Sequence, residues 1–113
     1  MSGDFRALEG GYKAVYHGAL PALGSSTALF NTAVTTALTN NPGKTICKVV
    51  FTLRTAGITM TFDGTTAATA GSVGIDYPTG TYELWLNANE LKNCRAIQNG
   101  GAATGYVVVF AAA

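Results

Sequence analysis

Charged side chains are scarce in this chain of 113 residues, with seven lysines and arginines and six aspartates and glutamates making up 12% of it. That share is about half of what an ordinary soluble domain carries. The basic residues are spread from Arg6 to Arg95 without a run, whereas a nucleic-acid surface needs clustered positive charge. The sequence therefore predicts no nucleic-acid partner.

Long apolar runs are also missing. No stretch approaches the run of about 18 apolar residues that crosses a membrane as a helix. The N-terminus, Met1 to Arg6, lacks the basic and then apolar pattern of a signal peptide. We therefore expect no membrane partner and a protein made in a cytoplasm.

The side chains that serve catalysis and metal binding are few. The single histidine, His17, has no accompanying nucleophile signature. Cys47 and Cys94 form no zinc-binding spacing; we expect two free buried thiols, with a disulfide as the alternative. Asp63 and Asp76 lie near glycines, where an aspartate usually supports a turn. The sequence thus predicts no enzyme, no metal and no cofactor.

Small uncharged residues take the place of charge, since alanine, glycine and threonine supply 48 of the 113 residues. One interpretation is a monomer with a threonine-covered surface. The other is a subunit whose surface is largely covered by its neighbours, because a free monomer normally needs more charge to stay soluble. The second interpretation predicts a homo-oligomer, for which a trimer is one form.

Strand patterns dominate the middle of the chain. In Thr45 to Arg54 and in Ile58 to Phe62, apolar and polar residues alternate, which is the period of a strand with one buried face. Residues 55–57 are a short connection that predicts an antiparallel hairpin between the two strands. An Asp63-Gly64 turn follows.

The remaining segments also predict strands. In 27–39 a helix is possible by spacing, but the five threonines favour a strand. We expect an all-β protein, an antiparallel β-sandwich of the jelly-roll or immunoglobulin-like type, with a small barrel as the alternative. Residues 1–10 would be an N-terminal arm and 11–113 a single domain. The predicted core consists of Val49, Phe51, Leu53, Ile58, Met60, Phe62, Leu84, Leu86 and Val108.

From Thr45 to Phe110 the chain resembles small virion proteins of tailed bacteriophages. The resemblance lies in the Thr-Phe-Asp-Gly-Thr-Thr turn at 61–66, the small-residue run 67–80, and the strands at 82–86, 95–97 and 106–110. It implies a structural protein of the virion, made in the host cytoplasm, which as a capsid decoration (cement) protein would bind the major capsid protein or other virion proteins. A tail, adaptor or fibre component is an alternative role.

Three residues are candidates for the interface. Trp85 alternates with Leu84 and Leu86 and therefore points away from them, either outward or into a second layer. An outward tryptophan often anchors a protein contact, and it would also stack on a sugar ring, so a carbohydrate-binding module is a further alternative. Phe5 and Arg6, in the expected arm, are the other two.

Overall fold

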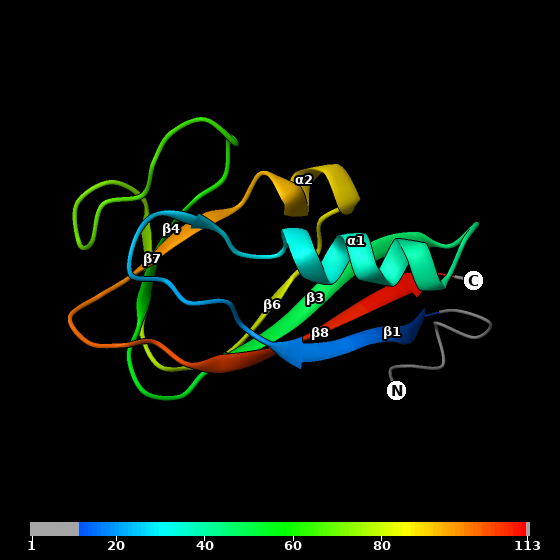
Figure 1. The fold of residues 1–113 in the computed structure, drawn as a ribbon, viewed down its shortest axis with the longest axis horizontal. Coiled ribbons are helices and arrows are strands. Elements are labelled where there is room, and N and C mark those ends of the chain that lie inside the picture. Colours follow the sequence, from blue (N-terminus) through cyan, green and yellow to red (C-terminus); the bar gives the residue numbers. More distant parts are fainter. Residues whose placement is uncertain (1–11, 113) are drawn as a thin grey trace.

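The computed structural model describes residues 12–112. Two four-stranded antiparallel sheets pack together as an all-β sandwich with two short helices (Figure 1). The first sheet has the strand order β1-β8-β3-β6 and the second has β2-β7-β4-β5. The elements are β1 (Tyr12–Ala19), β2 (Thr27–Ala28), α1 (Asn31–Asn40), β3 (Thr45–Leu53), β4 (Ile58–Thr61), β5 (Ile75–Tyr77), β6 (Gly80–Leu84), α2 (Ala88–Lys92), β7 (Arg95–Gln98) and β8 (Gly105–Ala112).

The strand pairing defines the type of sandwich. β1 pairs with β8, β2 with β7, β3 with β6 and β4 with β5, each time antiparallel. Two further pairs, β3 with β8 and β4 with β7, complete the sheets. This nested pairing of eight strands in two sheets is a jelly roll. The predicted β-sandwich is therefore confirmed.

The predicted hairpin between 45–54 and 58–62 is wrong, because the two strands belong to different sheets. β3 already has β8 on one side and β6 on the other, so β4 has no free edge to join. Gly57 lies in the short connection that carries the chain from β3 in the first sheet to β4 in the second, where there is little space for a side chain. A Cβ at Gly57 would lie 2.6 Å from the carbonyl oxygen of Tyr77.

The strand predicted for 27–39 is also wrong, since all but its first residues form α1. Ala33, Val34 and Ala37 are buried, which is the i, i+1, i+4 pattern of a helix with one apolar face. Figure 1 shows α1 lying across the sheet of β1, β8 and β3. The amide of Asn41 donates to the carbonyl of Ala37 at 2.9 Å and thereby caps the helix. Tertiary burial outweighs the weak helix propensity of threonine here.

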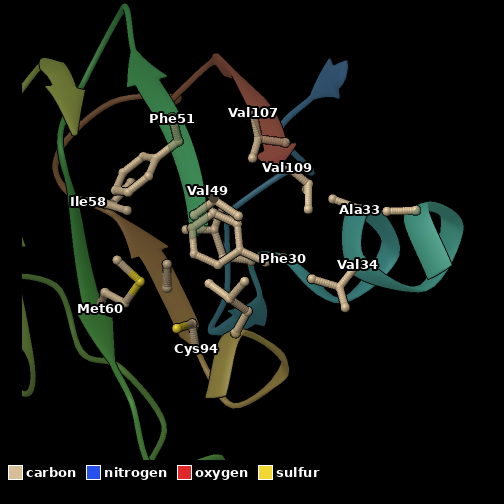
Figure 2. Packing of buried hydrophobic residues seen from close by; sticks show 14 of the residues in the cluster. Phe30, Ala33, Val34, Val49, Phe51, Ile58, Met60, Cys94, Val107 and Val109 are labelled. Atoms are coloured by element: carbon tan, nitrogen blue, oxygen red, sulfur yellow. The ribbon is translucent and has the colours of Figure 1, made fainter. Parts of the chain in front are cut away.

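The core lies between the two sheets and beneath α1. Phe30, at the start of the helix, and Phe51, on β3, point toward each other with ring centroids 5.4 Å apart (Figure 2). Both side chains are fully buried. Tilted aromatic pairs at this separation add to the stabilisation that comes from burial alone.

Five of the nine predicted core residues are fully buried: Val49, Phe51, Leu53, Ile58 and Met60. Phe62, Leu84 and Leu86 are half-buried and pack against the core. Val108 is misplaced, because its neighbours Val107 and Val109 are the buried residues of β8. A strand that is apolar on both faces cannot be oriented from its own sequence, so the prediction chose the wrong face.

The Asp63 turn is rigidly bonded. Its carboxylate accepts hydrogen bonds from the hydroxyl of Thr66 and from the backbone N–H groups of Thr65 and Thr66. These bonds, that of the Thr66 hydroxyl first, lower the pKa of Asp63 to about 2. Asp76 lies in β5 rather than in a turn, and the buried hydroxyl of Thr59 donates to it at 2.7 Å.

Both cysteines are free thiols in the structure, half-buried for Cys47 and fully buried for Cys94. Burial raises the pKa of Cys94 to about 12, so that thiol is unreactive near neutral pH.

We expect thiol counting to find two free thiols in the denatured, unreduced protein. In the native protein at pH 8, Cys94 should resist alkylation. A count of zero in the denatured protein would replace this result with a disulfide.

Candidate functional site: the outer face of the first sheet

One face of the first sheet points away from the core. We define this outer face by the side chains that alternate with the buried ones along its four strands: Tyr12, Ala14, His17 and Ala19 on β1; Tyr106, Val108 and Phe110 on β8; Lys48, Val50 and Thr52 on β3; Thr81 and Glu83 on β6; and Trp85 just beyond β6. No described helix or strand covers it. It combines four aromatic rings with few charges.

Two aromatic side chains meet across the sheet at one end of this face. Tyr12 belongs to β1 and Trp85 follows β6, and these strands are the opposite edges of the sheet. Their ring centroids are nevertheless 5.4 Å apart in an edge-on arrangement. The two side chains therefore extend toward each other over the central strands. We call this pair the aromatic arch.

Lys48 lies beneath the arch, with only 7% of its side chain exposed. Its Nζ donates to Oε2 of Glu83 at 2.9 Å. The same nitrogen lies 4.5 Å from the ring centroid of Trp85 and 4.9 Å from that of Phe110. A buried ammonium group needs compensation for its lost hydration, and one carboxylate with two aromatic rings provides it.

Glu83 connects the lysine to the arch. Its Oε1 accepts a hydrogen bond from the indole Nε1–H of Trp85 at 2.9 Å. The hydrogen bond from Lys48, followed by that from Trp85, lowers the pKa of the Glu83 carboxyl. The carboxylate is therefore ionised at neutral pH, and it balances the charge of Lys48. Its side chain is 48% exposed, so it remains available to a partner.

A second group of side chains occupies the opposite end of the face. The ring of Tyr106 lies 6.1 Å from that of His17 and 5.9 Å from the guanidinium of Arg54. Between this group and the arch lie two half-buried valines, Val50 and Val108. The outer face thus has aromatic groups at both ends and an aliphatic centre.

The structure places Trp85 on the outer face, where it is 51% exposed. Phe5 and Arg6 lie outside the described residues, so their role stays a prediction. Sequence reasoning missed the side chains around Trp85: Tyr12 and Lys48 contact its ring, and Phe110 contacts Lys48, each from a different strand. Only the pairing of β1, β8 and β3 brings them together, and no local pattern indicates it.

Among the described residues, no group of three or more histidine, cysteine, aspartate or glutamate side chains could hold a metal ion. None of the described helices has the length and apolarity that a membrane crossing needs. The recess between 19–24 and 102–105 is lined by small and aliphatic residues and by Gln98, none of which titrates.

Comparisons with protein-family models, with curated proteins and with solved structures found no match to this chain.

Proposed function

We propose that the protein is a non-enzymatic structural protein of a phage virion that binds the assembled head as a capsid decoration protein. The observation that carries the proposal is the outer face. It presents an exposed tryptophan, further aromatic rings and an aliphatic centre, and its Lys48–Glu83 pair is neutral. Surfaces rich in aromatic residues and poor in charge are those that proteins bury against each other.

Three further observations support the proposal. Eight-stranded jelly rolls occur in viral capsid domains, an argument from fold analogy alone. The turn at 61–66 that carries the resemblance to phage virion proteins is a well-bonded structural turn built around Asp63. With 12% charged residues, the chain is also suited to an assembly in which neighbours cover its surface.

The mechanism would be mass action. A subunit that binds only the assembled shell lowers the free energy of that shell and leaves the free capsid protein unaffected. Many copies on a symmetric lattice would stabilise the shell together, even where each contact is weak. Contacts with the shell would come from the N-terminal segment with Phe5 and Arg6, and the outer face would be buried against a protein neighbour.

Binding to capsids tests this function. Purified protein should co-sediment with capsids that lack it, and deletion of residues 2–10 should reduce the occupancy at least about tenfold. The circular dichroism spectrum should remain unchanged, because the deletion leaves every described strand intact. A matched control is Thr35→Ala on the exposed side of α1, which should bind as the wild type does. Full binding by the deletion variant would refute the role of the N-terminal segment, and no affinity for any virion part would refute the function.

A carbohydrate-binding module is the second candidate, because one observation favours it. Trp85 presents an exposed ring with the Glu83 carboxylate beside it, which is the combination of stacking surface and hydrogen-bond acceptor that a sugar needs. Binding of a polysaccharide, lost in Trp85→Ala and accompanied by no affinity for capsids, would establish this function instead.

A further inference from the structure

We propose that the protein neighbour on the outer face is a second copy of this chain, packed face to face about a two-fold axis that runs parallel to the strands between β8 and β3. This inference rests on the proposed function, which has the outer face buried against another subunit, and it names that subunit.

The size of the face matches a small symmetric interface. Four strands that are spaced by about 4.8 Å and are each about 25 Å long cover an area on the order of 500 Å² per copy. Two copies would bury about 1,000 Å² in total, which is the lower limit for a specific interface. Stacked sheets pack at about 10 Å, so the exposed ring of Trp85 would fill the space between them.

The strand order allows the outer face to be self-complementary about a two-fold axis. In the order β1-β8-β3-β6, a two-fold axis between the central strands places β8 over β3 and β1 over β6. One row across the sheet reads His17, Val108, Val50 and Glu83, by the pairing of these residues in register. The axis would therefore bring each Val108 against Val50 of the other copy.

The same row pairs opposite chemistries at its ends. His17 at the β1 edge would face Glu83 of the other copy, and this contact occurs twice in the dimer. Glu83 is ionised and half-exposed, and His17 is exposed. A histidine can donate a hydrogen bond to a carboxylate in its neutral and in its charged form. The interface thus contains no contact between like charges in this row.

The neighbouring rows pair large side chains with small ones. Ala14, Phe110 and Lys48 form one row, which Trp85 continues beyond β6. The axis would place the backbone of Trp85 over Ala14, the smallest residue of that row, while its ring extends over the central strands toward Tyr12. In the row of Ala19, Tyr106, Thr52 and Thr81, the axis would place Tyr106 over Thr52. Large residues set against small ones give the close packing that specific interfaces show.

Sedimentation velocity of the full-length protein, without capsids, tests the proposal. The wild type should form a concentration-dependent dimer. Val108→Glu would place a carboxylate against Val50 on each side of the axis and should raise the dissociation constant at least about 100-fold. His17→Glu would face Glu83 and should raise it about tenfold, whereas His17→Lys should leave it nearly unchanged. Thr35→Glu on α1 is the control and should dimerise as the wild type does.

The outcomes separate this proposal from the proposed function. If the wild type stays monomeric up to about 1 mM, its dissociation constant is weaker than that of even a weak interface of this size, and the dimer proposal is wrong. Dimerisation that survives Val108→Glu, with unchanged circular dichroism, overturns the choice of face. A monomer that binds capsids leaves the function standing, and a dimer that binds no virion part refutes the function alone. If the wild type is monomeric and binds a polysaccharide through Trp85, the outer face is a glycan-binding site and the dimer proposal is wrong.

Discussion

Replacing Phe51 by alanine should lower the free energy of unfolding by about 3–5 kcal/mol, because the substitution leaves a large cavity at the centre of the core. Phe51 is only 1% exposed, and its ring contacts those of Phe30, Tyr77 and Tyr82 at centroid distances of 5.4, 5.9 and 5.5 Å. Phe51 therefore packs against both the second sheet, through Tyr77, and the start of α1, through Phe30. The expected loss is a large fraction of the stability of a small domain.

Equilibrium unfolding in urea measures this effect. The control is Ile75→Ala, because Ile75 is an apolar strand residue that is 57% exposed and should cost less than about 1 kcal/mol. Equal losses in the two variants would contradict the assignment of the core. So would a loss below about 1 kcal/mol in Phe51→Ala.

Gly74→Ala should lower the free energy of unfolding by about 2–4 kcal/mol. The backbone of Gly74 has φ +130°, a region that residues with a side chain rarely adopt. A Cβ there would lie 2.6 Å from the backbone carbonyl oxygen of Met60, which belongs to the fully buried part of β4. The substitution therefore adds a steric clash to an unfavourable backbone conformation.

Two other glycines separate these contributions. Gly43 has φ +85° with open space around it, so Gly43→Ala should cost only the backbone strain of about 1–2 kcal/mol. Gly101 has ordinary backbone angles and open space, and Gly101→Ala should be close to neutral. Urea unfolding of the three variants should rank them in this order. A Gly74→Ala variant as stable as Gly101→Ala would refute the argument.

Most of the strands could be predicted because their apolar alternation is local. β3 and β4 show it, and the five core residues predicted in them are buried; Thr59 and Thr61 on the opposite face of β4 are buried as well, which the alternation did not predict. The pairing of the strands could not be predicted. β3 and β4 follow each other in the chain and look like a hairpin, but the two-sheet fold places them in different sheets. The helix α1 was missed since its burial depends on Phe30 and the first sheet, while its threonines favour a strand on their own.

The candidate site was predictable in one residue only. The alternation of Trp85 with two leucines indicates that it points away from them, either outward or into a second layer, and the structure places it on the outer face. Tyr12 and Lys48 lie far from it in the sequence, and their contact with Trp85 depends on the pairing of β1, β8, β3 and β6. Sites assembled across a sheet leave no spacing pattern along the chain, so sequence analysis finds single members rather than the group.

The aromatic arch also gives the protein an internal optical probe. Trp85 is the only tryptophan in the chain, so the intrinsic emission excited at its absorption edge comes from one position on the outer face. The indole is about half exposed to water, with an ammonium group over its ring and a tyrosine ring edge-on to it. Its emission wavelength and quantum yield respond to any molecule that displaces this water. Binding at this face is therefore open to direct observation in unlabelled protein.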